Sequence, residues 1–159
     1  MVAVGDRIPD VKVMINTDDG IKPAQTGELL GSGKVVLFAV PGAFTPGCSE
    51  YHLPGFVTRA ADVKAKGVDR IACIAVNDAF VMGAWGKDQN VGDDILMIAD
   101  GNGEFAEAMG LVMDGTGFGL GKRSQRYAAI LQDGVIQELL VEPGPGVDVS
   151  GVNNVLSKL

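Results

Sequence analysis

Residues 35–48 read VVLFAVPGAFTPGC. The stretch opens with six apolar residues, which predict a strand covered on both faces, and a Pro-Gly pair then ends that strand. Thr45 and Pro46 are typical of the N-cap and the first residue of a helix. We therefore expect a strand, a tight connection and a helix, with Cys48 in the first turn of that helix.

A cysteine in a first helical turn has an unusual electrostatic setting. Backbone N–H groups there have no partner within the helix, and together with the positive end of the helix dipole they favour a thiolate over a thiol. The thiolate is the nucleophilic form of cysteine. A free cysteine can instead serve as a small buried apolar residue, but Cys48 lies among turn-forming residues rather than inside an apolar strand. We therefore identify Cys48 as a candidate nucleophile.

Two neighbours of Cys48 could assist it. The hydroxyl of Thr45 could point at the sulfur or at an oxygen of a bound substrate. Pro41 could form a wall that keeps bulk water away from the thiolate. Both residues have simpler alternatives, since Thr45 could be only an N-cap and Pro41 could only end the strand.

The composition restricts the classes of function. The chain has 159 residues, 47% of them hydrophobic and 21% charged, which fits a single domain spanning residues 1–159. A net charge of −7 argues against nucleic acid as a partner, because phosphates select clustered Lys and Arg. The longest apolar runs have the length of strands, so no membrane span is expected. One His and two Cys offer no metal-ligand spacing, and we expect neither a metal nor a cofactor.

The compartment follows from the N-terminus. Residues 1–7 lack a basic segment followed by an apolar one, so we expect no export and a cytoplasmic protein. In a reducing cytosol both cysteines are free thiols by default. The chain has no C-x-x-C pair for dithiol exchange, and the glycine-rich residues 115–121 do not match a dinucleotide-binding loop.

Apolar patterns and turn residues predict an alternation of strands and helices. Strands are expected near Val11–Ile15, Val35–Val40, Ile71–Val76, Ile95–Ala99, Tyr127–Leu131 and Val135–Val141, the last two joined by an Asp-Gly turn. A first helix is expected after the N-cap Thr45, with a kink at Pro54 and with Gly67 as the C′ residue that ends it. Further helices are expected from Asn77 or Asp78 through Trp85, over Glu104–Met109 and over Ser150–Leu159. This order predicts an α/β protein with a mixed central β-sheet and helices on both faces, the thioredoxin-like fold.

Lys122, Arg123 and Arg126 form the densest basic cluster of this acidic chain. For Lys122 and Arg123 a solvated surface position is an equal alternative. Arg126 directly precedes an expected strand, so its side chain has better access to the interior. An inward guanidinium would place a cation near the thiolate and could donate two hydrogen bonds to an oxygen substrate.

The roles of two further residues stay open. Cys73 lies within the expected Ile71–Val76 strand, where core packing is favoured, but it could resolve an oxidised Cys48 if the helix unwinds. His52 follows Cys48 by four positions and shares its helix face, so it could contact the site. A plain hydrogen-bonded helix histidine is an equal alternative for His52.

One segment resembles a known family. Residues 41–56, PGAFTPGCSEYHLPGF, closely resemble the active-site segment of the peroxiredoxins, in the subgroup of the plant type II and peroxiredoxin-five-like enzymes. The resemblance continues in order through residues 73–81, 84–85, 126–127, 132–134 and 141–143, and so covers nearly the whole chain. It implies a thioredoxin fold and, for this subgroup, commonly a homodimer packed near the active-site loops.

By position, the resemblance implies a role for each candidate residue. Cys48 would be the peroxidatic cysteine, which attacks the O–O bond of hydrogen peroxide or an organic hydroperoxide and becomes a sulfenic acid. Thr45 would hydrogen-bond the reacting oxygens, Pro41 would shield the sulfur, and Arg126 would stabilise the thiolate and the polarised peroxide. The expected function is that of a thiol-dependent peroxidase, an antioxidant oxidoreductase of cell redox homeostasis.

The route of reduction stays open at this point. Some members of the family carry a resolving cysteine near the C-terminus, but residues 145–150, PGVDVS, contain none. The sulfenic acid must then be reduced by Cys73 or by an external thiol, such as glutathione with glutaredoxin, or thioredoxin. We favour the external thiol, because joining Cys73 to Cys48 would break the packing of a covered strand. The alternative function is a redox sensor or relay, in which oxidised Cys48 passes a disulfide to a partner protein.

Overall fold

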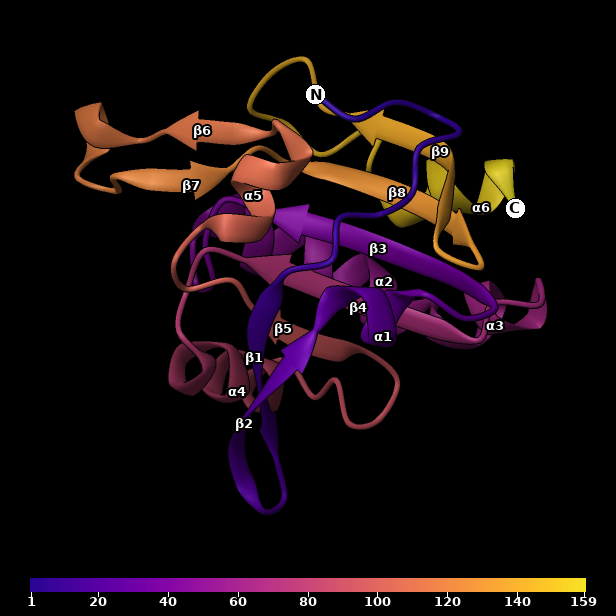
Figure 1. The fold of residues 1–159 in the computed structure, drawn as a ribbon, viewed down its shortest axis with the longest axis horizontal. Coiled ribbons are helices and arrows are strands. Elements are labelled where there is room, and N and C mark those ends of the chain that lie inside the picture. Colours follow the sequence, from indigo (N-terminus) through magenta and orange to yellow (C-terminus); the bar gives the residue numbers. More distant parts are fainter.

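A mixed sheet of seven strands forms the centre of the molecule (Figure 1). The structure is a computed structural model that describes residues 1–159. The strands are β1 (Lys12–Thr17), β2 (Gly20–Gln25), β3 (Lys34–Val40), β4 (Arg70–Ala75), β5 (Leu96–Ala99), β6 (Val112–Asp114), β7 (Lys122–Ser124), β8 (Tyr127–Gln132) and β9 (Val135–Val141). The helical segments are α1 (Thr26–Leu30), η1 (Cys48–His52), α2 (Leu53–Thr58), α3 (Ala60–Ala65), α4 (Ala79–Asp88), α5 (Glu104–Met109), η2 (Thr116–Phe118) and α6 (Val152–Lys158).

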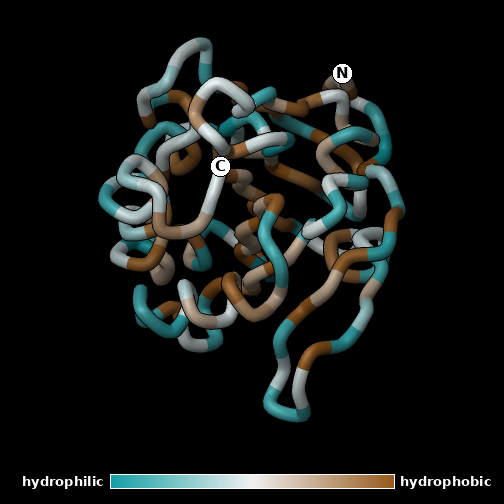
Figure 2. The backbone as a smooth tube through the Cα atoms, turned by 90° about the vertical axis from the view of Figure 1, so that its left-hand side faces the viewer, coloured by the Kyte–Doolittle hydropathy of each residue, from teal (hydrophilic) through white to brown (hydrophobic).

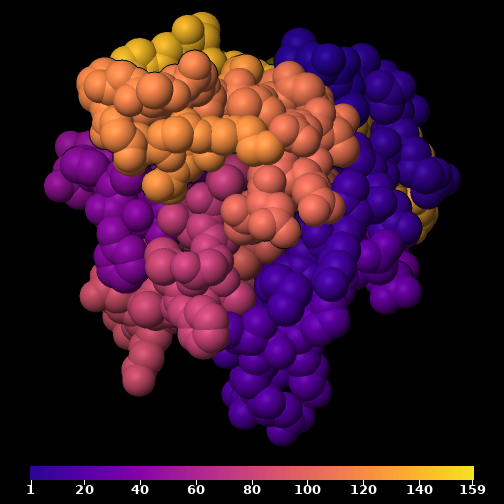
Figure 3. Space-filling model, turned by 60° about the vertical axis from the view of Figure 1, so that its left-hand side comes forward, coloured from indigo at the N-terminus to yellow at the C-terminus, as the bar shows by residue number.

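The sheet combines parallel and antiparallel strands. Its order is β2-β1-β5-β4-β3-β8-β9, and β6 pairs with β7 in a separate small sheet. The three central strands β3, β4 and β5 run parallel, whereas each outer strand pairs antiparallel with its neighbour. This mixed α/β sheet confirms the expected fold class. The β1–β2 hairpin projects from the body as an arm, at the bottom of Figures 1 and 3.

Strand β3 builds a core on each side of the sheet. Every second residue from Val36 enters one core, together with buried residues of α2, α3, α4 and α6. The residues between them, from Val35 onward, enter a second core with α5 and with Leu30 at the end of α1. An apolar strand covered on both sides requires helices on both faces, as the sequence predicts. In Figure 2 the hydrophobic segments run through the middle of the molecule, and the tip of the projecting hairpin is hydrophilic.

The register of the sheet brings distant segments to one edge. Strands β3 and β8 are antiparallel, with Ala39 opposite Tyr127, so β3 ends where β8 begins. Arg126 directly precedes β8 and therefore lies at the edge where the chain leaves β3 toward Cys48. Strand β4 is parallel to β3 and ends at the same edge, followed by Asn77.

Two local predictions are confirmed by backbone geometry. Asp133 and Gly134 join β8 to β9 with φ angles of 50° and 81°, the positive values that a tight hairpin turn requires. The side chain of Asp78 accepts a hydrogen bond from the N–H of Val81 at 2.8 Å. Asp78, and not Asn77, is therefore the cap of α4.

The helix after Cys48 differs from its prediction. Residues 48–52 form a π-helical turn, in which the N–H of Leu53 donates to the carbonyl of Cys48. Pro54 has no N–H group to donate an α-helical hydrogen bond to the preceding turn. The helix is therefore distorted in that turn, whereas the sequence predicts a kink at Pro54 itself. The helix is then interrupted at Arg59. Helix α3 ends at Ala65 with Lys66 as its C-cap, so Gly67, with a φ angle of 86°, is the C′ residue that the sequence predicts.

Several short elements were not predicted. Strand β2 contains Pro23 and is only partly covered, so it lacks the alternation that identifies a strand. The segments α1, β6, β7 and η2 have at most five residues each, which is too short for a periodic signal. None of the helices is both long and apolar enough to span a membrane.

Candidate active site

The connection from β3 places Cys48 at the beginning of a helical turn. The carbonyl of Thr45 accepts a hydrogen bond from the N–H of Ser49 at 2.9 Å, so Cys48 lies in the first turn, as predicted. Phe44, one residue before Thr45, has a φ angle of 65°, which a residue with a side chain adopts only at a conformational cost. A strained loop of this kind persists because its surroundings hold it, and such loops are common at functional sites.

A hydrogen bond from the next strand end helps to hold this loop. The side-chain oxygen of Asn77 accepts from the N–H of Ala43 at 2.9 Å. Asn77 follows β4, so the connection after β3 is tied to the connection after β4. The loop that leads to Cys48 is therefore held at two points, by strand β3 from which it continues and by Asn77 after β4.

The guanidinium of Arg126 contacts the sulfur of Cys48. Its Nη2 donates to Sγ at 3.2 Å. Both residues are buried, with exposed fractions of 0% for Cys48 and 9% for Arg126. A cation that donates a hydrogen bond to a sulfur in a dry environment stabilises the thiolate, because little water screens the interaction. The structure therefore brings together the two residues that carry the sequence-based prediction.

His52 occupies the other side of the same guanidinium. Its Nδ1 lies 2.9 Å from Nη1 of Arg126, and its Nε2 lies 2.9 Å from the carbonyl oxygen of Ser150. The ring is 1% exposed and packs near the rings of Phe38 and Phe56, with centroid distances of 5.0 and 5.8 Å. Burial, and then the charge of Arg126, lower the pKa of His52 from 6.5 to about 4. His52 is therefore part of the site and neutral near pH 7.

Thr45 and Pro41 both lie in the connection between β3 and Cys48. The Thr45 hydroxyl donates to the carbonyl of Gly42 at 2.7 Å. Of its two predicted directions, the one toward the sulfur is therefore not seen in this structure, and the one toward a substrate oxygen stays a prediction. A hydroxyl whose hydrogen is engaged in this way still offers its lone pairs to a substrate. Thr45 starts the helix through its carbonyl rather than through a side-chain cap. Pro41 is half-buried directly after β3.

The basic cluster divides between the surface and the interior. Lys122 is exposed and forms an ion pair with Glu107, as a surface position predicts. Arg123 is half-buried, and its Nη1 donates to the carbonyls of Pro41 and Val76 at 3.4 Å each. Pro41 and Val76 are the first residues after β3 and β4, so Arg123 links the ends of these two strands. The surface alternative is thus wrong for Arg123.

Gly47 makes room for the arginine. A Cβ atom at this position would lie 3.1 Å from Nη2 of Arg126, the nitrogen that donates to Cys48. That distance is shorter than ordinary van der Waals contact. Glycine at position 47 therefore permits the approach of the guanidinium to the sulfur.

Cys73 lies in the covered strand β4, opposite Phe38 of β3. It is fully buried and belongs to the same apolar core as Cys48, and both cysteines are free. Burial, followed by the proximity of Cys48, raises the pKa of Cys73 well above its usual value of 9.0. A thiol held in its protonated form is a poor nucleophile, so the structure supports core packing for Cys73.

The single tryptophan of the chain reports on the helical turn of Cys48. The Nε1 of Trp85 donates to Oγ of Ser49 at 2.9 Å, and its ring centroid lies 6.4 Å from that of Phe44. Ser49 directly follows Cys48. A movement of this turn therefore changes the surroundings of the indole.

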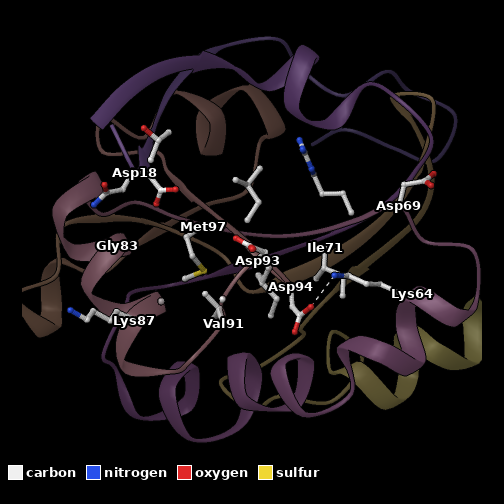
Figure 4. A pocket seen from close by; sticks show the side chains of 17 residues that line it. Asp18, Lys64, Asp69, Ile71, Gly83, Lys87, Val91, Asp93, Asp94 and Met97 are labelled. Atoms are coloured by element: carbon white, nitrogen blue, oxygen red, sulfur yellow. Dashed lines mark hydrogen bonds and ion pairs between the residues drawn. The ribbon is translucent and has the colours of Figure 1, made fainter. Parts of the chain in front are cut away.

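A cavity of about 560 Å³ lies elsewhere on the molecule (Figure 4). Its lining includes Arg70 and Leu96, the first residues of β4 and β5. Cys48 follows the end of the parallel strand β3, so the cavity lies at the opposite edge of the sheet and contains none of the proposed site residues. No group of three or more His, Cys, Asp or Glu side chains in the structure is arranged to hold a metal ion.

Sequence reasoning missed two participants in the site and left a third undecided. Ser150 contacts His52 through its carbonyl, and the charge of Glu142 acts on the same ring. Residues 141–143 belong to the family resemblance, but nothing in the sequence around Glu142 or Ser150 indicates that either lies near His52. For His52 the spacing of four residues from Cys48 gave a signal, but the spacing does not reveal its partners. One of those partners is the carbonyl of Ser150, which lies in the segment between β9 and α6, and the position of this segment follows only from the folded structure.

Comparisons with known proteins agree with this geometry. The family model described as Redoxin matches residues 3–156. Peroxiredoxin-2B of Arabidopsis thaliana is 43% identical over 99% of this chain and 98% of its own length. The solved structure of reduced Prx3 from Vibrio vulnificus in complex with H2O2 is 50% identical with a TM-score of 0.95, over 99% of both chains. Peroxiredoxin 5 from Alvinella pompejana is 36% identical with a TM-score of 0.86, over 99% of this chain and 97% of its own. With the match extending over nearly all of its length, this chain belongs to the Redoxin family and is a peroxiredoxin.

Proposed function

We propose that Cys48 is the peroxidatic cysteine of this thiol-dependent peroxidase, and that its substrates are hydrogen peroxide and organic hydroperoxides. The observation that carries the assignment is the 3.2 Å contact between Nη2 of Arg126 and the Cys48 sulfur. Cys73, the other cysteine, has no such cation donating to it and has a raised pKa. Cys48 is therefore the better nucleophile of the two.

The proposed first step transfers one oxygen atom. The Cys48 thiolate attacks the nearer oxygen of a peroxide ROOH, an S–O bond forms, and the O–O bond breaks. The sulfur loses two electrons and becomes a sulfenic acid, while the departing RO⁻ takes up a proton and leaves as ROH. Negative charge moves from the sulfur onto the departing oxygen during this step, so donors near the departing oxygen lower its barrier, while a donor at the sulfur keeps Cys48 in the reactive thiolate form.

The loop offers groups for both oxygens. Arg126 already donates to the sulfur and can shift part of this contact to the polarised peroxide. The Thr45 hydroxyl donates to a backbone carbonyl, so its lone pairs can accept the hydrogen of the attacked peroxide. We assign to Pro41, which is half-buried directly after β3, the role of limiting the access of water.

For the second step we propose an external thiol, such as glutathione with glutaredoxin, or thioredoxin. The sulfenic acid condenses with the thiol to a mixed disulfide and water, and a second thiol releases the Cys48 thiol and a disulfide product. The complete burial and raised pKa of Cys73 support this route over internal resolution. The relay function would stop at the mixed disulfide with a partner protein.

We also propose a homodimer that packs near the active-site loops. Three large aromatic side chains support it, since Phe44, Phe80 and Phe118 are 52%, 75% and 89% exposed. Exposed aromatic residues are enriched at protein interfaces. Sedimentation of the wild type against Phe118→Asp tests this: a dimer that becomes a monomer in the variant supports it, and a monomeric wild type at all concentrations overturns it.

The activity is tested by peroxide consumption in the presence of each reducing system. The wild type and Cys73→Ala should consume many equivalents of peroxide, whereas Cys48→Ser should consume none above background. Sustained turnover supports the peroxidase, while a stable mixed disulfide without turnover supports the relay. An active Cys48→Ser variant would overturn the assignment of the nucleophile.

A further inference from the structure

The imidazole of His52 lies between a pure donor and a pure acceptor. Nη1 of Arg126 can only donate, so the ring nitrogen beside it at 2.9 Å, Nδ1, must accept. The carbonyl of Ser150 can only accept, so the ring nitrogen beside it at 2.9 Å, Nε2, must carry the proton. Both contacts are satisfied by one form alone, the neutral imidazole with its proton on Nε2.

This form of His52 fixes the direction of the arginine. The guanidinium is planar and rigid, so holding Nη1 on the His52 side determines where Nη2 points. Nη2 is the nitrogen that donates to the Cys48 sulfur at 3.2 Å. A protonated His52 would instead place an N–H group against the Arg126 cation and would remove the acceptor.

The segment after β9 holds His52 in turn. The Glu142 carboxylate accepts hydrogen bonds from the N–H of Asp148 at 2.8 Å, and from the N–H and hydroxyl of Ser150 at 2.8 and 2.6 Å. The N–H of Glu142 donates to the backbone carbonyl of Arg126 at 3.0 Å. Glu142 thus links the backbone of Arg126 to the residue whose carbonyl holds His52. Partial burial opposes ionisation of Glu142, but the hydrogen bonds from Ser150 and from the backbone of residues 148 and 149 together outweigh it and lower the pKa of Glu142.

We propose that His52 is a positioning residue for Arg126: as the neutral Nε2–H tautomer it directs the guanidinium at the Cys48 sulfur, and its protonation disables this arrangement. The proposal deepens the proposed peroxidase function and rests on it. The surroundings of the ring are consistent with a neutral form, since burial and the charge of Arg126 lower the pKa of His52 to about 4. The charged groups that act on the ring are Arg126, before β8, and Glu142, after β9. The aromatic rings of Phe38 in β3 and Phe56 in α2 pack near it.

The first test uses the wild type, because its single histidine gives an unambiguous nitrogen-15 spectrum. We expect the shifts of an Nε2–H tautomer near pH 7, and a titration midpoint near 4 rather than 6.5. An Nδ1–H tautomer or a midpoint near 6.5 would overturn the proposal. This experiment does not depend on catalysis, so it remains decisive for the geometry even if the protein reduces no peroxide.

The second test compares three substitutions by the rate of Cys48 oxidation in a single turnover. His52→Phe keeps a ring without an acceptor, and we expect at least an approximately tenfold loss, since a hydrogen bond to a charged group is removed. His52→Asn keeps an oxygen near the position of Nδ1 and should recover much of the rate. His52→Gln keeps a polar group near the position of Nε2 only and should resemble His52→Phe.

A double substitution separates positioning from a general loss of structure. In an Arg126→Gln background, His52→Phe should cause no further loss, because the residue that it positions is already absent. Thermal unfolding of each variant identifies any that does not fold. Equal losses in His52→Asn and His52→Phe, or additive losses in the double variant, would overturn the proposal. A wild type that reduces no peroxide would instead overturn the proposed function.

Discussion

Arg126 and Cys48 are 78 positions apart in the sequence, and the Nη2 of the arginine donates to the sulfur of the cysteine at 3.2 Å. Antiparallel pairing of β3 with β8 produces this contact, because it places the start of β8 at the edge where β3 ends. One strand delivers the loop that contains the cysteine, and the other delivers the cation. The sheet itself thus assembles the site.

Replacement of the arginine should slow the oxidation of Cys48. Arg126→Gln retains a polar side chain but removes the positive charge and one arm of the guanidinium. We expect the single-turnover rate with hydrogen peroxide to fall roughly 10- to 100-fold, since hydrogen bonds to charged groups contribute about 1.5–3 kcal/mol. The fluorescence of Trp85 follows the reaction, because its indole bonds to Ser49 in the same turn. An unchanged rate would remove Arg126 from the mechanism.

Gly47→Ala tests how closely the guanidinium must approach. The added Cβ would lie 3.1 Å from Nη2 of Arg126 and push it away from the sulfur. We expect about a tenfold loss in the rate of Cys48 oxidation, because small misplacements of reacting groups are costly. Gly117→Ala is the matched control, since its Cβ would meet no atom within 4 Å. Equal rates in the two variants would contradict the steric argument.

The sequence predicts much of this arrangement but not all of it. Cys48 and the central strands are identified because their signals are local: an apolar run, a Pro-Gly break and a helix start. Arg126 is identified because it adjoins a strand. The inward position of Arg123 escapes prediction, since it depends on carbonyls at two strand ends that only the folded sheet brings near. The direction of the Thr45 hydroxyl escapes it as well, because it depends on how the loop turns between Gly42 and Thr45.

The contacts of His52 illustrate the same limit. Its position four residues after Cys48 shows which helix face it shares, whereas its bond to the Ser150 carbonyl joins residues 98 positions apart. No periodic pattern marks the segment between β9 and α6 that provides this carbonyl. The π-helical turn is a further example. It forms because the N–H of Leu53 donates to the carbonyl of Cys48. A proline at position 54 is compatible with this turn but does not by itself predict it.

His52 should also give the stability of the protein a defined pH dependence. Its pKa is about 4 in the folded protein and 6.5 in its ordinary state, so between these values only the unfolded chain binds the proton. The free energy of unfolding should therefore fall by about 3 kcal/mol as the pH drops from 6.5 to 4, with no further loss from His52 below that range. Urea denaturation of the wild type and of His52→Gln over this range measures the effect as the difference between the two curves. Parallel curves would contradict it.

Cys73 should prove dispensable for turnover. Cys73→Ala removes only a buried sulfur from β4, and we expect a loss of about 1 kcal/mol in the free energy of unfolding. With an external thiol present, its peroxidase rate should equal that of the wild type. A complete stall after one turnover would instead make Cys73 the resolving residue.

The assignment of Cys48 as the nucleophile is tested most directly by mass spectrometry after one equivalent of hydrogen peroxide, with a sulfenic-acid trap and no reductant. The proposed mechanism predicts the trapped adduct on Cys48 and a free thiol at Cys73. A trapped adduct on Cys73, or an unmodified Cys48, would contradict the central claim.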